Sequence, residues 1–150
     1  MGPMPRTHRW DVLLVIAAGG ALGSLARYGT GHALPHPPGG FASATLAANV
    51  AGCLLIGVLM ETVTRAARPH RLVRPFLGIG VLGGFTTMST AMVDVLDSVR
   101  AGHPALAAGY LAASLAASLA AVVAGILVVR ALSRRLRSPH GGTSEDPGGA

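Results

Sequence analysis

The sequence predicts an all-α membrane protein with four transmembrane helices. Hydrophobic residues make up 51% of the 150 residues and charged residues only 12%, a composition that is rare among soluble domains. A hydrocarbon core about 30 Å thick needs roughly 20 apolar residues per helix, so four such runs use more than half of the chain. Little sequence remains for a soluble core. We therefore treat residues 12–130 as a single transmembrane domain.

The charge distribution argues against a nucleic-acid-binding protein. The formal net charge is +6, but all twelve basic residues are arginines and most of them flank apolar runs. A basic soluble binder would carry polar faces on which arginines alternate with aromatic residues, whereas the chain has only three Phe, two Tyr and one Trp. Arginines beside apolar runs are typical of membrane flanks. The expected surroundings are a lipid bilayer, with no nucleic acid as partner.

Cysteine and histidine indicate neither a metal cluster nor an enzyme. Cys53 is the only cysteine, so no intramolecular disulfide can form, and small-residue helix packing explains its place in an apolar run. The six histidines are scattered through loops and tails without the paired spacing of a metal site. No Ser, Cys or His in the apolar runs has a base and an orienting acid in reach, and no nucleotide-binding loop occurs. We expect no enzymatic activity.

The first two spans differ in polarity. The first, residues 12–34, contains one cation, Arg27. A cleaved signal peptide is the alternative, since Arg6 and Arg9 precede an apolar stretch, but the three spans that follow make a signal anchor sufficient. The second span, residues 41–60, follows a turn rich in proline and glycine and carries no charge.

The third span, residues 75–93, is expected to break near its middle. Its glycines lose backbone order, and the hydroxyl residues that follow compete for backbone carbonyls. These residues place the break between Gly83 and Ser89. Non-helical backbone at membrane depth persists only where it is buried in protein or lines a polar cavity, so a break there indicates a functional site. A flexible, unbroken glycine-rich span is the alternative.

The fourth span, residues 105–129, carries a narrow polar stripe. A Leu-Ala-Ala-Ser repeat with a period of four places Tyr110, Ser114 and Ser118 on nearly one helix face. Close helix packing through small residues is the alternative explanation of this repeat.

The arginines predict the membrane orientation. With four spans, both termini and the loop between the second and third spans share one side, and that side holds ten of the twelve arginines. By the positive-inside rule this side is the cytoplasm. We therefore expect a multi-pass protein of the plasma (inner) membrane with both termini cytoplasmic. Residues 1–11 form the N-terminal segment, and residues 131–150 form a disordered tail, rich in Gly, Pro and Ser beyond Ser138.

Three segments stand out in order along the chain: GGALGSLARY at 19–28, NVAG at 49–52 and GVLGGFTTMST at 80–90. In sequence and in spacing they resemble the CrcB/Fluc family of fluoride channels. The likeness covers residues 12 to about 130. Its specific part is Gly-Gly-Phe-Thr-Thr-x-Ser-Thr after a second helix that carries an asparagine.

The resemblance implies passive export of fluoride, which relieves its toxicity, through an antiparallel, dual-topology dimer with two pores. It also implies a structural sodium ion at the dimer interface, held by the main-chain carbonyls of Gly83 and Thr86 from each subunit. Carbonyl oxygens suit a hard cation and become free where a helix breaks.

The resemblance further implies a set of pore groups. Amide and hydroxyl donors can replace the water around fluoride without trapping it by a full opposite charge. An interhelical hydrogen bond is the alternative role for the asparagine among them. The groups carried over are Asn49, Tyr110, Ser114 and Ser118.

Two charged residues also match family positions. Arg27 corresponds to the first-helix arginine, and Asp94 stands where the family usually has Glu after the break. Charges at membrane depth are costly, so each is expected to have a partner or a wet vestibule. Arg27 either attracts the anion or anchors its helix. Anchoring is the interpretation for Asp94.

The chain departs from the family at its two pore phenylalanines, where it has Met88 and Ala91. Phenylalanine offers a positive ring edge to an anion, which Met and Ala do not. The arginine bias also opposes insertion of one sequence in both orientations. Our hypothesis is therefore a heterodimer with a related subunit of opposite topology, which supplies the phenylalanines. A homodimer is the nearest alternative.

Two other classes of function stay open. A small four-helix, proton-coupled multidrug-type exporter would share this size, but it would need a carboxylate within the membrane, and the carboxylates of this chain lie at or beyond the ends of the spans. A non-conducting structural membrane subunit is the other alternative.

Overall fold

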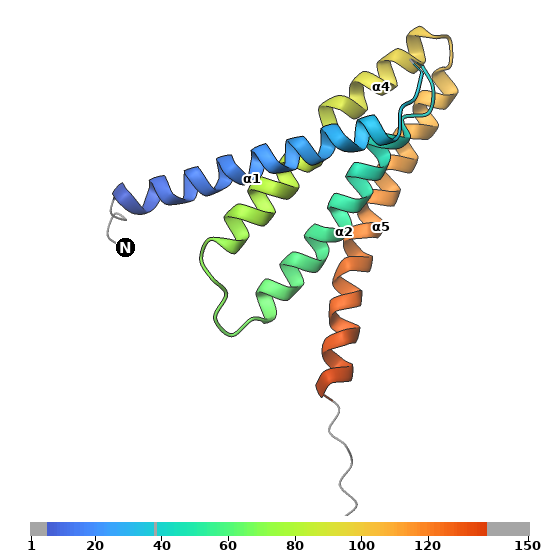
Figure 1. Cartoon of the computed structure of the whole chain (residues 1–150). Helices are drawn as coiled ribbons and strands as arrows, with labels where there is room; N and C mark the ends of the chain where they lie inside the picture. The colour runs from blue at the N-terminus through green and yellow to red at the C-terminus, as the bar shows by residue number, and fades with distance from the viewer. Residues whose placement is uncertain (1–5, 38, 138–150) are drawn as a thin grey trace, which may run out of the picture.

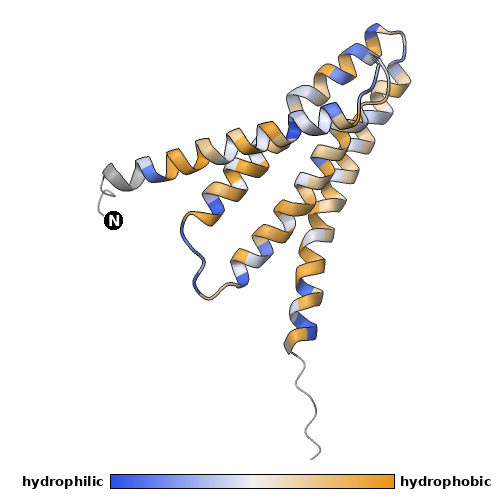
Figure 2. Ribbon diagram, viewed as in Figure 1, coloured by the Kyte–Doolittle hydropathy of each residue, from blue (hydrophilic) through white to orange (hydrophobic). Residues whose placement is uncertain are grey.

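The predicted four-span helical fold is confirmed. The computed structural model describes residues 6–37 and 39–137, and within these ranges it contains helices and no strand. Hydrophobic residues cover the lengths of the helices, while hydrophilic ones gather at the loops and helix ends (Figure 2). The stretches long and apolar enough to cross a membrane are Trp10–Ala33, Ser43–Arg65, Arg74–Arg100 and Pro104–Leu136.

The helical elements are α1 (Arg6–Ala33), α2 (Ser43–Arg65), η1 (Arg74–Leu82), α3 (Gly83–Phe85), α4 (Met88–Arg100) and α5 (Pro104–Arg137). They form two packed groups. α2 and α5 lie side by side, and α4 packs on the N-terminal part of α5 (Figure 1). α1 crosses the first half of the third span, and the N-terminal part of α1 projects away. The α1–α2 and α4–α5 connections lie at one end and the α2–η1 loop at the other.

Glycines bring the helix backbones into direct contact at both main crossings. Where α1 crosses η1, a Cβ added to Gly23 would overlap the carbonyl oxygen of Val81, and one added to Gly80 would lie 2.9 Å from the Cα of Gly19. Where α2 crosses α5, a Cβ on Gly57 would overlap the backbone of α5. Such close approach lets helices associate by van der Waals contact in a bilayer, where no hydrophobic force drives them together.

The third span is not a single continuous α-helix. Its first part, η1, is wound as a π-helix, and α3 follows it for one short turn. Thr86 and Thr87 then have extended backbone, with φ/ψ of −80°/153° and −152°/122°, before α4 begins at Met88. This interruption lies inside the interval from Gly83 to Ser89. The π-helical winding was not anticipated; it is rare and is often found at functional sites.

The predicted tail needs a correction. α5 continues to Arg137, so the disorder predicted for residues 131–150 is wrong at residues 131–137. The sequence RALSRRLR is rich in helix-forming residues and contains neither glycine nor proline, so nothing stops the helix there. The rest of that prediction, on residues 138–150, lies outside the described residues, as do residues 1–5.

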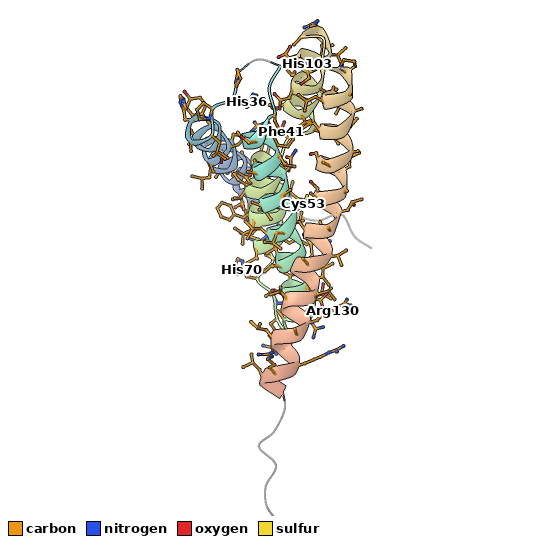
Figure 3. The ribbon with its side chains drawn as sticks, turned by 90° about the vertical axis from the view of Figure 1, so that its right-hand side faces the viewer. His36, Phe41, Cys53, His70, His103 and Arg130 are labelled. Atoms are coloured by element: carbon orange, nitrogen blue, oxygen red, sulfur yellow. The ribbon has the colours of Figure 1, made fainter. Side chains whose placement is uncertain are left out.

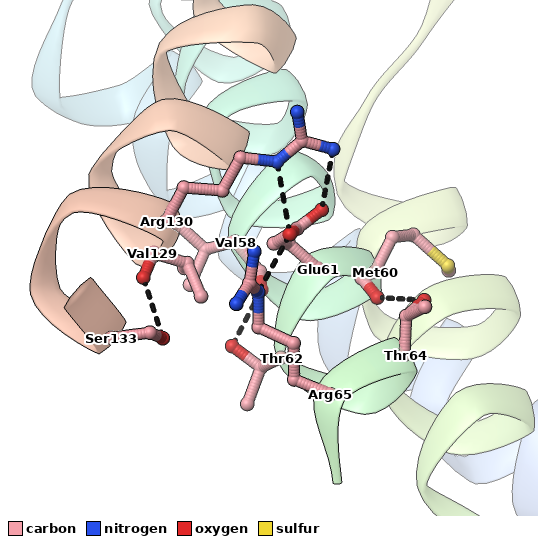
Figure 4. A network of polar contacts seen from close by, with 9 residues as sticks. All are labelled: Val58, Met60, Glu61, Thr62, Thr64, Arg65, Val129, Arg130 and Ser133. Carbon is pink, nitrogen blue, oxygen red and sulfur yellow. Dashed lines mark hydrogen bonds and ion pairs between the residues drawn. The ribbon is translucent and has the colours of Figure 1, made fainter. Parts of the chain in front are cut away.

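An ion-pair network joins α2 to α5 at the arginine-rich end. The Glu61 carboxylate accepts from Arg65 Nε at 2.7 Å and from Arg130 at 3.0 and 3.3 Å (Figure 4). The arginine side chains are 36% and 50% exposed, so the pairs contribute little stability by themselves. Of the two pairs, Arg130–Glu61 joins α5 to α2, while Arg65–Glu61 lies within α2.

Candidate functional site

A pocket of about 220 Å³ lies where α2, the start of α4 and α5 meet. Its lining mixes amide and hydroxyl residues with Met88, Ala91, Leu111 and Leu115, and we name it the polar pocket after the former. Cys53, one of its lining residues, lies midway along the bundle, between the end marked by His103 and the end marked by Arg130 (Figure 3). The pocket is therefore at mid-membrane depth in a chain that spans the bilayer. Its lining includes five of the six predicted pore residues, namely Asn49, Met88, Ala91, Ser114 and Ser118.

Asn49 holds the interrupted backbone of the third span. Its Nδ2 donates to the carbonyl oxygen of Thr87 at 2.9 Å, and its Oδ1 accepts from the Thr87 N–H at 2.8 Å. In a continuous α-helix that N–H would donate to the carbonyl of Gly83. The interhelical hydrogen bond considered for Asn49 is thus present, while the same side chain also lines the pocket.

Thr87 begins α4 with a cluster of hydroxyls. Its Oγ1 accepts from the Thr90 N–H at 3.1 Å and lies 3.0 Å from Thr90 Oγ1 and 3.2 Å from Ser89 Oγ. This N-cap satisfies one of the amide groups that the break leaves without a helical acceptor. Backbone and side chain of Thr87 are both fixed, the first by Asn49 and the second by its own helix.

The polar stripe of α5 faces inward. Ser114 is 6% exposed, and its hydroxyl has no hydrogen-bond partner among the described residues. Tyr110 is 4% exposed but does not line the pocket; it packs with Ala42 and Ala91, and its ring meets that of Phe41 edge-on at 5.6 Å. The Tyr110 hydroxyl is also buried without a partner in the described part of the chain. A buried hydroxyl without a partner is costly. Of the two, the Ser114 hydroxyl belongs to the lining of the pocket and can donate to a ligand there.

A second pocket, of about 360 Å³, lies on the other side of Thr87, which lines both pockets. Arg27, half-buried, lines it together with the hydroxyl residues Thr45 and Thr90. Asp94 is not among the residues that line this pocket; it accepts a hydrogen bond from Thr45 Oγ1 at 2.7 Å, which ties α4 to α2. This bond favours the anchoring interpretation of Asp94.

The two residues predicted to hold a cation line one small cavity. Gly83 and Thr86 border a space of about 110 Å³ beside Cys53. The Thr86 N–H and hydroxyl both donate to the carbonyl oxygen of Leu82, each at 3.0 Å. Among the described residues, no group of three or more His, Cys, Asp or Glu side chains could hold a metal ion.

Comparison with known proteins places the chain in a family. The family model described as CrcB-like protein, Camphor Resistance (CrcB), matches residues 14–126. The chain belongs to the CrcB family. The resemblance found in the sequence is thereby confirmed.

Proteins similar in sequence to this CrcB-family chain are named fluoride-specific ion channels. It is 51% identical over 131 residues to the protein named fluoride-specific ion channel FluC 2 of Thermobifida fusca (strain YX), covering 84% of this chain and 97% of the relative. It is 49% identical over 116 residues to a FluC 2 of Streptomyces avermitilis, covering 75% and 73%. With FluC of Rhodospirillum centenum the identity is 42% over 120 residues, covering 79% and 95%. Streptomyces avermitilis also has a relative named FluC 3, so paralogues occur in one organism.

Sequence reasoning missed three residues of the site. Thr45 binds Asp94, Thr87 is held by Asn49, and Cys53 lines both the polar pocket and the small cavity. Thr45, Asn49 and Cys53 follow one another at intervals of four, so they lie on one face of α2. This spacing could have identified Thr45 and Cys53 as neighbours of Asn49 from the sequence. Nothing in the local sequence singled out the Thr87 backbone.

Proposed function

We propose that this chain is a subunit of a fluoride-specific channel through which fluoride leaves the cell passively across the plasma membrane. The polar pocket carries the proposal, because it gathers Asn49, Ser114 and Ser118 at mid-membrane depth in a CrcB-family chain whose relatives are named fluoride-specific ion channels. Fluoride gives up its water only where other hydrogen-bond donors replace it. Hydroxyl and amide groups supply these donors without a full positive charge.

The carboxylates favour passive conduction over proton-coupled export. An exporter of that kind needs a membrane-embedded carboxylate that is free to exchange a proton. Asp11 pairs with Arg71, Glu61 with two arginines, and Asp97 with Arg100. Asp94 accepts from Thr45, and all four lie towards the ends of the spans.

A fluoride efflux assay tests this function. The full chain, reconstituted with a related subunit from the same organism, is expected to release fluoride but not chloride from liposomes when valinomycin sets a potassium diffusion potential. Ser114→Ala is expected to slow release about tenfold, the effect of losing one donor worth about 1.4 kcal/mol. Ser133→Ala is the control, since the Ser133 hydroxyl on the same helix donates to Val129 O. Equal rates in the two variants, or release of chloride, would refute the proposal.

We also propose that the chain works in an antiparallel heterodimer. Three observations support it: the ten-to-two arginine bias, the absence of phenylalanine at Met88 and Ala91, and the existence of numbered paralogues in one organism among the relatives. Met88 lines the pocket and is 58% exposed, so a partner subunit could contact it there. Robust fluoride release by the chain alone would refute the obligate heterodimer without affecting the fluoride function.

The third part of the proposal is a structural sodium ion held by the carbonyls of Gly83 and Thr86. Because the Thr87 N–H donates to Asn49, the Gly83 carbonyl loses the partner that a continuous helix would give it. Hard carbonyl oxygens beside a small cavity fit a hard cation. Protein prepared in N-methylglucamine instead of sodium is expected to lose fluoride release and to regain it when sodium, but not potassium, is restored. Equal release in all three media would contradict the sodium site.

A further inference from the structure

An apolar groove of about 390 Å³ opens at the arginine-rich end of the molecule, away from the polar pocket. One wall comes from α1, one from the α2–η1 loop and one from the start of η1. All lining side chains except one histidine are aliphatic or aromatic hydrocarbons. The lining residues are Val15, His70, Leu72, Val73, Phe76 and Leu77.

The loop wall of the groove is held in a defined conformation. The Val73 N–H donates to the carbonyl oxygen of His70 at 3.0 Å, and the Leu72 N–H donates to His70 Nδ1 at 3.3 Å. Because Nδ1 accepts, a neutral His70 ring carries its proton on Nε2, where it remains a donor. Arg71 pairs with Asp11 of α1 at 3.1 Å, which holds the loop against the first helix.

The charges around the groove are mostly positive. Arg68, Arg71 and Arg74 lie in the loop or at its end, within a few residues of the groove lining, and the facing part of α1 supplies one carboxylate, Asp11. A single carboxylate cannot neutralise three guanidinium groups. The rim of an apolar groove at the level of the membrane flank is therefore cationic.

We propose that this groove binds an anionic phospholipid, with part of an acyl chain against Val15 and Phe76 and the phosphate among His70, Arg71 and Arg74. Basic pockets between transmembrane helices on the cytoplasmic side suit anionic head groups, and the apolar floor suits the chain below them. A second copy of this chain is less suitable here, because its own net charge of +6 repeats the excess of arginine. The site does not depend on the proposed fluoride function.

The only tryptophan of the chain provides a reporter for this site. Trp10 is 66% exposed and directly precedes Asp11, the residue that pairs with Arg71. The full chain is reconstituted in phosphatidylcholine bilayers that contain increasing fractions of dibrominated phosphatidylglycerol or, in a parallel series, dibrominated phosphatidylcholine. Bromine quenches tryptophan fluorescence at short range, so the two series give the relative affinity of the anionic and the zwitterionic lipid near Trp10.

The expected result is a preference of at least about fivefold for phosphatidylglycerol, and loss of about fivefold of it in Arg74→Gln, the effect of one arginine near an anionic head group. Arg134→Gln is the matched control, since Arg134 is exposed and lies on the last turns of α5, and it should leave the preference unchanged. Equal quenching by the two lipids, or an equal loss in both variants, would overturn the proposal. If neither brominated lipid quenched the fluorescence of Trp10, protein would cover the groove. That result would also overturn the proposal.

Discussion

The two halves of the third span are held by different kinds of contact. Before the break, η1 packs on α1 through glycines, with the backbones in contact at Gly23 and Gly80. After the break, α4 is tied to α2 by side-chain hydrogen bonds, from Asn49 to Thr87 and from Thr45 to Asp94. The first half is fixed by shape and the second by polar groups.

This difference assigns separate tasks to the two halves. Backbone contacts between glycines leave little room for movement, so we interpret the crossing of η1 and α1 as a scaffold. Hydroxyl and amide groups can exchange hydrogen-bond partners, so under the proposed function we expect the polar half to face the ion. Asn49 lies where the two kinds of contact meet, since its amide binds the backbone of Thr87, two residues after the end of α3.

Disrupting the scaffold should have the largest effect. Gly23→Val would place side-chain atoms on the Val81 carbonyl, and because both groups belong to helix backbones neither can move aside cheaply. We expect a loss of about 3 kcal/mol or more, enough to prevent assembly in a marginally stable protein. Size-exclusion chromatography and thermal melting in detergent measure it.

Gly29→Ala is the control for that substitution, because a Cβ at Gly29 has no atom within 4 Å. Alanine is the better helix former, so this variant should be as stable as the parent or slightly more so. If Gly23→Val and Gly29→Ala had the same stability, close backbone packing would not be what holds η1 against α1.

The next largest effect is expected from removing the Asn49 amide. Asn49→Ala leaves the Thr87 N–H and carbonyl without their partners, at about 1–3 kcal/mol for each group, or lets the N–H return to Gly83 and close the helix. Either outcome should raise the sodium concentration needed for fluoride release and slow release at least tenfold. A slower release with unchanged sodium dependence would show that Asn49 acts on the anion alone.

The sequence predicted the spans and the interval of the break, but not how the break is held. Apolar runs of membrane length leave the backbone only one way to satisfy its hydrogen bonds, which is helical. Gly83 and Gly84 followed by hydroxyl residues indicated where this helix would weaken. The acceptor for the Thr87 N–H lies 38 residues away in Asn49, and no local pattern records such a contact.

The four-residue spacing also could not predict that Tyr110 and Ser114 have different neighbours in the fold. A repeat of four places Tyr110 and Ser114 on one face, but it does not say which neighbour covers each turn. The aromatic ring of Phe41 closes over Tyr110, whereas Ser114 opens on the polar pocket. The π-helical winding of η1 was missed because helix propensity does not distinguish a π-helix from an α-helix.

Phenylalanine at the two divergent positions of α4 should give unequal results. Ala91 is 2% exposed and packs with Ala42 and Tyr110, so Ala91→Phe overfills that cluster at a cost of about 2 kcal/mol. Met88 is 58% exposed, so Met88→Phe should be nearly neutral. Thermal melting of the two variants compares them. Equal stability would mean that the polar half of the span is less tightly packed than its burial indicates.

The smallest effect is expected at the second tie between α2 and α4. Thr45→Val keeps the shape of a buried side chain but removes the hydrogen bond of 2.7 Å to Asp94, which should cost about 1–2 kcal/mol because the acceptor is a carboxylate. Thr62→Val is matched to it, since Thr62 lies on the same helix and donates only to Val58 O of its own turn. Thr62→Val should therefore lose almost no stability. If thermal melting showed equal losses at Thr45 and Thr62, the bond to Asp94 would not hold α4, and the polar half would depend on Asn49 alone.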